Sequence, residues 1–255
     1  MEYPLGTLLL AGAVAVVSEY VDSALGMGYG TTVTPLLLLL GFDPLKVVPI
    51  VLGSEFATGL LAAKLHHTFG NVSFARGSAD RKAALLLGTC GAVGAVAGVE
   101  LATHVSRSFV SAYIGAVVLA TGLVIIATRR WNPRFSWKGI GAVGLVAAFN
   151  KGIGGGGYGP LLTGGQILSG VNPRAAIGVT SFAESVVSLV GLVTYFVILR
   201  GVDWQLGLPV LAGGLVSAPL SAWTVSKVQL RHLRVLAGIA ACLLGLLVLL
   251  RLSSP

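Results

Sequence analysis

Long runs of apolar residues, separated by short polar and basic segments, make up most of the chain. Several of these runs approach the roughly 20 apolar residues that a helix needs to cross the hydrocarbon core of a bilayer. They are Ala83–Ala102, Phe109–Ala127, Leu206–Trp223 and Val235–Leu250. An earlier run, Leu5–Val17, has no basic leader and is interpreted as a retained helix rather than a signal peptide. The pattern predicts an all-α, polytopic membrane protein.

The chain repeats itself at an offset of 129 residues. Paired Tyr, Pro and Glu residues at one offset are hard to obtain by chance, even in a glycine-rich chain. The repeat therefore predicts two related halves, as in many transporters. The matched pairs are Gly26 and Gly155, Gly28 and Gly157, Tyr29 and Tyr158, Gly30 and Gly159, Thr34 and Thr163, Gly41 and Gly170, Pro44 and Pro173, and Glu55 and Glu184.

Each half is predicted to hold a helix, a glycine-rich break, a short apolar segment and three long helices. The leading helices are expected at about 6–25 and 139–152, and the short segments at 31–41 and 160–171. At about 1.5 Å per residue, the short segments cover half a hydrocarbon core and are predicted to be half-helices. The predicted organisation is a single membrane domain, made of a first repeat (1–128), a cytoplasmic linker (129–138) and a second repeat (139–255).

The basic residues indicate how the chain is oriented. The formal charge is +8, but only 10% of residues are charged and 55% are hydrophobic, and the basic residues lie in clusters between the apolar runs. This favours membrane orientation over nucleic-acid binding. If the short segments cross the membrane, 12 of the 17 basic residues share one side, and the other keeps Lys46, Arg107, Lys151, Arg200 and Arg251.

If the short segments do not cross, the same residues divide 10 to 7. The positive-inside rule favours the more uneven division, which has five crossings per half and both termini outside. An odd number of crossings inverts the second half relative to the first. The two breaks are then expected to enter from opposite faces and meet near the midplane of the membrane.

The two breaks, Gly26–Gly30 and Gly152–Gly159, interrupt helices in apolar surroundings, so their amides need polar partners. Exposed amides at the start of a helix bind anions, and Pro160 is expected at the first position of the second half-helix. The alternative is that these glycines only let helices pack closely, which is the interpretation of scattered glycines such as Gly94 and Gly98.

Ionisable residues inside membrane spans cost free energy and are functional candidates. Glu55 and Glu184 are equivalent in the repeat, and so are Asp22 and Lys151, which have opposite charge just before the two breaks. Glu55, Glu184 and Asp22 are candidate proton-coupling residues; for the glutamates, the alternative is a structural hydrogen bond to the break of the same half. Lys151 either attracts an anionic substrate or forms an ion pair with Asp22.

The polar residues near the breaks could complete a binding site, with Tyr29 and Tyr158 as its gates. The candidate substrate-binding residues are Gly28, Tyr29, Gly30, Thr31, Thr32, Asn150, Lys151, Gly155, Gly156, Gly157, Tyr158, Gly159, Thr180 and Ser181. We assign His66 and His67 to the membrane interface. No cofactor or metal set is implied, because no Walker motif occurs and Cys90 and Cys242 lie inside apolar runs.

Both breaks end in Gly-Tyr-Gly, and each leads through a short apolar segment to a Gly-x-(Asp/Asn)-Pro motif, GFDP or GVNP. In these features the chain resembles the TauE/SafE family of sulfite and organosulfonate exporters over nearly its whole length. The resemblance implies transport of small sulfur-containing anions, such as sulfite or sulfonates, across a bacterial or archaeal inner membrane. The first break has fewer glycines than the second, so the two need not act alike.

The leading hypothesis is a secondary transporter that exports small sulfur-containing anions by alternating access, with proton coupling as an additional hypothesis. Its expected partners are a small anionic substrate and the lipid bilayer, without nucleic acid; a homo-oligomer is left open. An anion channel is the alternative, since a channel needs no coupling carboxylate. An intramembrane enzyme is less favoured, because no H-E-x-x-H helix or convincing Ser-His pair occurs.

Overall fold

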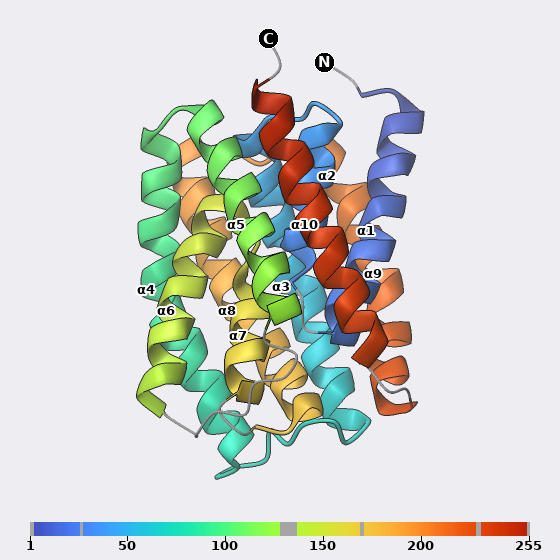
Figure 1. Ribbon diagram of the computed structural model, residues 1–255, viewed down its shortest axis with the longest axis vertical. Helices are drawn as coiled ribbons and strands as arrows, with labels where there is room; N and C mark the ends of the chain where they lie inside the picture. The colour runs from blue at the N-terminus through green and yellow to red at the C-terminus, as the bar shows by residue number, and fades with distance from the viewer. Residues whose placement is uncertain (1–2, 26–27, 128–136, 169–170, 228–230, 254–255) are drawn as a thin grey trace.

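The computed structural model describes residues 3–25, 28–127, 137–168, 171–227 and 231–253, which form helices with no strand among them. The helices in chain order are α1 (Leu5–Leu25), α2 (Tyr29–Leu39), α3 (Pro44–Thr68), α4 (Ala79–His104), α5 (Arg107–Ala127), α6 (Trp137–Gly154), α7 (Tyr158–Leu168), α8 (Pro173–Leu199), α9 (Trp204–Lys227) and α10 (Arg231–Ser253). Both chain ends lie at the same end of the helical bundle (Figure 1).

Within the described residues, five helical segments are long and apolar enough to cross a membrane. They are Leu5–Ala24, Pro44–Thr68, Ala79–His104, Arg107–Val124 and Arg174–Leu199. The prediction of an all-α, polytopic membrane protein is therefore confirmed. Most of the predicted linker 129–138, together with Gly26 of the first break, lies outside the described residues.

The two short helices, α2 and α7, have 11 residues each and begin at Tyr29 and Tyr158. Each follows a glycine with a φ of 81°, Gly28 or Gly157, a backbone conformation that other residues rarely adopt. α7 therefore starts two residues before Pro160, so the prediction that Pro160 is its first residue is wrong. A proline is still tolerated there, because the first turn of a helix needs no internal N–H donor.

The Gly-x-(Asp/Asn)-Pro motifs start the long helices α3 and α8. The Asp43 carboxylate accepts a hydrogen bond from the Leu45 amide at 2.8 Å, and the Asn172 side chain accepts one from the Arg174 amide at 2.9 Å. In both helices proline follows the capping residue, where its missing N–H costs nothing. The repeated motif thus ends each half-helix segment and begins the next span at an equivalent place.

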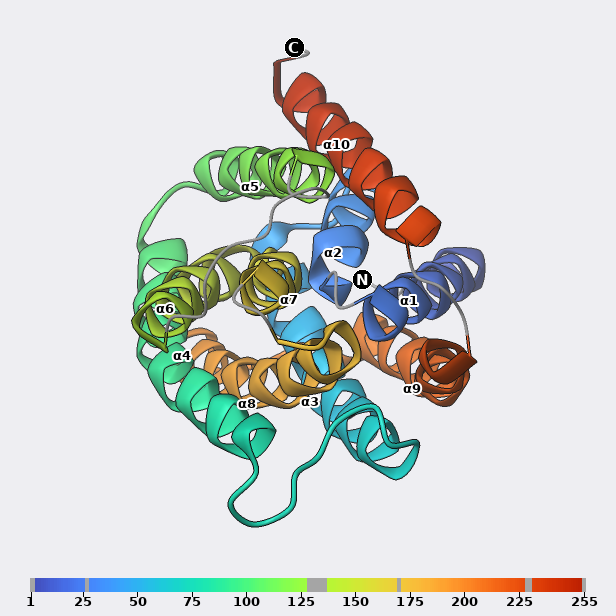
Figure 2. The same ribbon diagram turned by 60° about the horizontal axis from the view of Figure 1, so that its bottom comes forward.

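Helix contacts in the two halves correspond to each other. The contact of α1 with α9 corresponds to that of α6 with α4, and the contact of α3 with α9 corresponds to that of α8 with α4. The equivalent helices α3 and α8 pack on each other, and so do α5 and α10. Exchanging the halves leaves this pattern unchanged, as a two-fold relation between them would require. The long helices surround α2 and α7, which lie inside the ring in Figure 2. The inversion of one half relative to the membrane stays a prediction.

Glycines allow the closest helix contacts. A Cβ on Gly98 of α4 would lie 2.2 Å from the Phe149 carbonyl oxygen of α6, and one on Gly94 would lie 2.5 Å from the Leu145 oxygen. In the equivalent pair of helices, a Cβ on Gly213 of α9 would lie 2.3 Å from the Gly12 oxygen. These scattered glycines therefore act in close packing, as predicted.

Candidate functional site

One buried lysine joins the two halves at the centre of the bundle. Lys151, near the end of α6, places Nζ 2.5 Å from Oε2 of Glu55 on α3 and 2.7 Å from Oε1 of Glu184 on α8. None of these side chains is more than 4% exposed. Because each ion loses its hydration when it is buried, the cluster carries a free-energy cost and is a candidate for function rather than for stability.

Glu55 also binds the start of the first half-helix. Its Oε1 accepts a hydrogen bond from the Gly30 amide at 3.0 Å, and its Oε2 accepts a longer one from Ser188 Oγ at 3.4 Å. The Gly30 amide lies in the first turn of α2, where amides have no partner inside the helix. The hydrogen bond considered from the sequence is thus present for Glu55, which connects this amide to the Lys151 ammonium.

The two glycine breaks touch each other. A Cβ on Gly30 would lie 1.6 Å from the Gly155 oxygen, and one on Gly156 would lie 2.7 Å from the Gly30 carbonyl carbon. The Gly157 amide, just before α7, donates a hydrogen bond to Thr31 Oγ1 of α2 at 2.9 Å. Glycine is therefore needed at Gly30 and Gly156 for the close approach of the half-helices, and at Gly155 and Gly157 for a backbone with positive φ.

Asp22, at the end of α1, caps the first break. Its Oδ1 accepts a hydrogen bond from the Gly28 amide at 2.6 Å. Carboxylate oxygens of Asp22, Glu55 and Glu184 lie within 4.8 Å of one another, which is close enough to hold a cation. The Lys151 ammonium already supplies positive charge to the two glutamates. The ion pairs of Lys151 are thus with the glutamates rather than with Asp22, the partner considered in the sequence.

Tyr29 and Tyr158 are both fully buried beside the centre. The Tyr29 hydroxyl donates to the Val210 carbonyl at 3.3 Å and accepts from Ser54 Oγ at 3.3 Å. Lys151 Nζ lies 5.7 Å from the centre of the Tyr158 ring, within the range of a cation–π interaction. The Tyr158 hydroxyl has no hydrogen-bond partner within the described residues.

The remaining predicted residues are divided between the centre and its surroundings. Thr32 is half-buried and Gly159 is buried. The Asn150 side chain accepts a hydrogen bond from Tyr113, and the Thr180 hydroxyl accepts from both Thr163 and Gln166 of α7 at 2.9 Å. Ser181 donates to the Ile177 carbonyl of its own helix. These bonds join Asn150, Thr180 and Ser181 to neighbouring helices or their own backbone rather than to Lys151.

Glu19 on α1 was missed by the analysis of the sequence. It is 1% exposed; Oε1 accepts a hydrogen bond from Ser23 at 2.5 Å, while Oε2 has no partner within the described residues. Glu19 interacts electrostatically with Glu55 and Glu184. An acidic residue inside the predicted first helix, at about 6–25, was a signal that could have identified it.

His66 and His67 have different environments. His67 is exposed, in agreement with an interfacial position. His66 is fully buried: Nε2 lies 3.1 Å from the Ser23 carbonyl oxygen, and Nδ1 lies 3.0 Å from Asn71 Nδ2. The interfacial position of His66 stays a prediction, since α3 turns this residue toward α1 and places only its neighbour on the outer surface.

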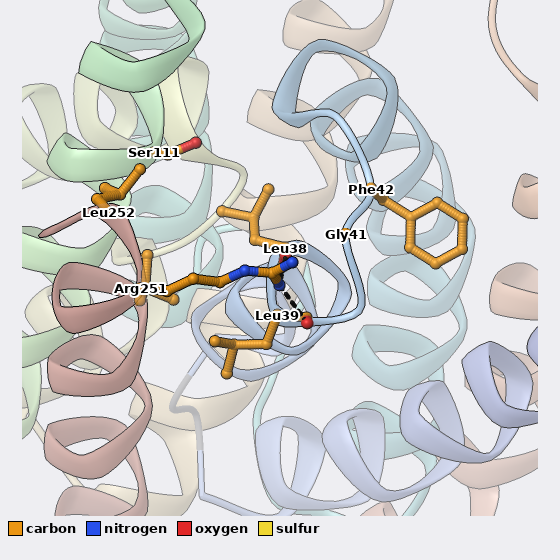
Figure 3. A pocket seen from close by; sticks show the side chains of 8 residues that line it. Leu38, Leu39, Gly41, Phe42, Ser111, Arg251 and Leu252 are labelled. Atoms are coloured by element: carbon orange, nitrogen blue, oxygen red, sulfur yellow. Dashed lines mark hydrogen bonds between the residues drawn. The ribbon is translucent and has the colours of Figure 1, made fainter. Parts of the chain in front are cut away.

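The cavities near the half-helices differ in size and position. Beside the second break, a cavity of about 10 Å³ is lined in part by Tyr113, Asn150 and Gly156, with room for about one water molecule. A larger cavity of about 230 Å³ lies at the far end of α2, where Arg251 donates hydrogen bonds to the Leu38 and Leu39 carbonyls (Figure 3). Arg251 is suited to this end, because a positive charge favours the carbonyl end of a helix.

The fold and this centre define an all-α, multi-pass membrane protein in which half-helices meet at buried charged residues. Many secondary transporters belong to this class. Residues 10–248 match the sulfite exporter TauE/SafE family, and the chain belongs to that family. It is also 28% identical over 245 residues to the probable membrane transporter protein YtnM of Bacillus subtilis (strain 168), covering 91% of this chain and 79% of that protein. The chain is thus a membrane transporter and not an enzyme.

Proposed function

We propose that this transporter exports small sulfur-containing anions, such as sulfite or organosulfonates, across the inner membrane. The observation that carries the proposal is the buried Lys151 ammonium beside the contact between the two half-helix starts. An ammonium and helix-start amides are the donors that recognise oxyanions. The family description favours sulfite or a related anion as the substrate.

In the proposed mechanism, the anion binds between the starts of α2 and α7, and the halves rock against each other to open alternate faces. The predicted residues of both breaks contribute amides and hydroxyls, while Glu55, Glu184 and Asp22 exchange protons. The inverted halves and a cytoplasmic linker belong to the same proposal. The buried, ion-paired centre favours a carrier over an open channel.

The test is anion flux in proteoliposomes that contain the purified full chain. We expect saturable flux of sulfite or a sulfonate, accelerated by unlabelled anion on the opposite side, as exchange through a carrier requires. Lys151→Met should abolish this flux, whereas Lys64→Met, on the exposed side of α3, should retain it. Flux that does not saturate and runs at channel rates would reject the carrier mechanism.

The substrate can be identified by thermal stability. A ligand that binds only the folded state raises the free energy of unfolding with the logarithm of its concentration over its Kd, and the unfolding temperature rises with it. Sulfite, sulfate, thiosulfate and small sulfonates should be compared with chloride at equal ionic strength. Equal stabilisation by all of these anions would argue against a selective sulfur-anion site.

A further inference from the structure

The Glu55 carboxylate occupies two donors that an oxyanion would use. Its Oε1 accepts from the Gly30 amide at 3.0 Å, and its Oε2 accepts from the Lys151 ammonium at 2.5 Å. One carboxylate therefore spans the start of α2 and the charge supplied by the other half. Sulfonate and sulfite oxygens form the same charge-assisted hydrogen bonds as a carboxylate.

The glutamate at the equivalent position of the repeat is held differently. Glu184 Oε1 binds the Lys151 ammonium at 2.7 Å. Within the described residues, a hydrogen bond from a half-helix amide is present for Glu55 and not for Glu184. The two halves therefore differ at this point, and the difference distinguishes Glu55 from its counterpart.

The centre has additional hydrogen-bond donors. The Tyr158 and Thr34 hydroxyls are fully buried and have no hydrogen-bond partner within the described residues. The Thr34 oxygen lies 3.2 Å from the position of a Cβ on Gly155, against the second break. The Gly30 amide and the Lys151 ammonium are themselves occupied, because the Glu55 carboxylate accepts from both of them. An anion that binds to this pair of donors must therefore displace that carboxylate.

The charged groups around Glu55 determine whether an anion can bind at the centre without a compensating positive charge. Titratable side chains from four helices surround Glu55. They are Lys151 of α6, Glu184 of α8, Asp22 and Glu19 of α1, and Tyr29 at the start of α2. Four carboxyl groups thus belong to this centre, and the Lys151 ammonium pairs with two of them, Glu55 and Glu184. Adding an anion to this centre without adding a positive charge is unfavourable in surroundings of low dielectric constant.

We propose that Glu55 is a tethered competitor for the anion site: substrate displaces its carboxylate from Gly30 and Lys151, and the displaced carboxylate takes up one proton. This inference rests on the proposed function and assigns the proton-coupling role to one of the candidate carboxylates. One proton moves from solvent to Glu55 for each monovalent anion that takes its place. The total charge of the centre stays constant, and the anion and the proton are bound from the same side.

Calorimetry on the full chain in lipid nanodiscs tests this exchange. The probe is methanesulfonate, which stays ionised at neutral pH, whereas sulfite itself titrates and would confuse the proton count. Titrations in two buffers of different protonation enthalpy measure the protons taken up per anion. We expect about one proton for the wild-type chain, with affinity that falls as the pH rises.

The Glu55→Gln variant should take up almost no protons and should bind methanesulfonate about tenfold more tightly at pH 8, since the competing charge is gone. Glu184→Gln should still take up a proton. Glu100→Gln, the same change on the exposed end of α4, should behave as wild type. Proton uptake that survives in Glu55→Gln, or a lower affinity in that variant, would overturn the competitor role.

Infrared difference spectra of the wild-type chain provide a measurement that does not depend on the variant folding. Addition of methanesulfonate should produce the carbonyl band of a protonated carboxyl group, and its absence together with zero proton uptake would also reject the inference. If the wild-type chain neither binds nor transports any sulfur anion, the proposed function itself fails. Binding or flux without proton uptake would reject the tethered competitor alone.

Discussion

Lys151 supplies the positive charge that compensates Glu55 and Glu184 in the buried centre. It has two ion-pair partners, and both remain buried if the ammonium is removed. Breaking a buried ion pair from one side typically costs about 3–5 kcal/mol, because the remaining charge is left uncompensated. The same residue is thus expected to matter for the stability of the bundle and for binding of the anion.

Lys151→Met, which keeps the length of the side chain and removes its charge, separates these two contributions. We expect the unfolding temperature to fall by roughly 10 °C, from the cost of the unpaired glutamates and the usual sensitivity of a chain of this size. Methanesulfonate should no longer stabilise the variant. Lys64→Met is the control, and a Lys151→Met protein that is still stabilised by anions would place the binding site elsewhere.

Two buried tyrosines provide a matched comparison of binding and stability. Tyr195 donates a hydrogen bond to the Gly152 carbonyl at 3.0 Å, so Tyr195→Phe should lower stability by about 1 kcal/mol. The Tyr158 hydroxyl is unpartnered within the described residues, so Tyr158→Phe should leave stability nearly unchanged but weaken anion binding. Thermal unfolding with and without methanesulfonate measures both effects. Equal anion affinities in wild type and Tyr158→Phe would remove Tyr158 from the proposed site.

At the scale of the helices, close approach through glycine positions the breaks. α4 packs on α6, the helix that carries Lys151, with Gly98 against the Phe149 carbonyl. A displacement of α6 would move Lys151 relative to both glutamates. The glycines of α4 thus influence the centre although none of them belongs to it.

Gly98→Ala should therefore reduce both thermal stability and transport, since its Cβ would lie 2.2 Å from backbone that cannot move independently. Gly141→Ala on α6 is the matched control, because a Cβ there meets nothing within 4 Å. It should be neutral or slightly stabilising, as alanine favours a helix over glycine. A Gly98→Ala protein as stable and active as Gly141→Ala would contradict this account of the α4–α6 contact.

The helices and half-helices could be predicted from the sequence, because apolar runs, the repeat and the Asp-Pro and Asn-Pro motifs are local signals. The exact start of α7 could not, because the positive φ of Gly157 lets the helix begin before Pro160. The partners of Lys151 and the burial of Glu19 and His66 depend on which helices meet. Such contacts join residues far apart in the chain, and a periodic pattern does not specify them.

At the scale of the whole molecule, polar contacts link the two halves at the end that holds both chain termini. Lys46 lies 3.6 Å from Asp203, and the Tyr3 hydroxyl donates to the same carboxylate at 2.8 Å. Arg251 of α10 binds the carbonyl end of α2. In an alternating-access cycle, these contacts must break when this end opens, so they favour the conformation in which it is closed.

Asp203→Asn should accordingly shift the transporter toward the state open at this end. A partly exposed ion pair contributes about 0.2–1 kcal/mol, so the open population should rise roughly 1.5- to 5-fold. The open population can be measured by the rate at which a cysteine at position 48 is labelled. The Val48→Cys change is made in a chain with Cys90 and Cys242 replaced by alanine. Val48 is buried, and its side chain lies against the second break near Gly155. A membrane-impermeant thiol reagent should label it faster by that factor. Glu100→Gln changes an exposed carboxylate whose basic neighbour, His104, lies on α4 itself, and it should leave the rate unchanged. An equal increase in this control would show a general loosening rather than the opening of one end.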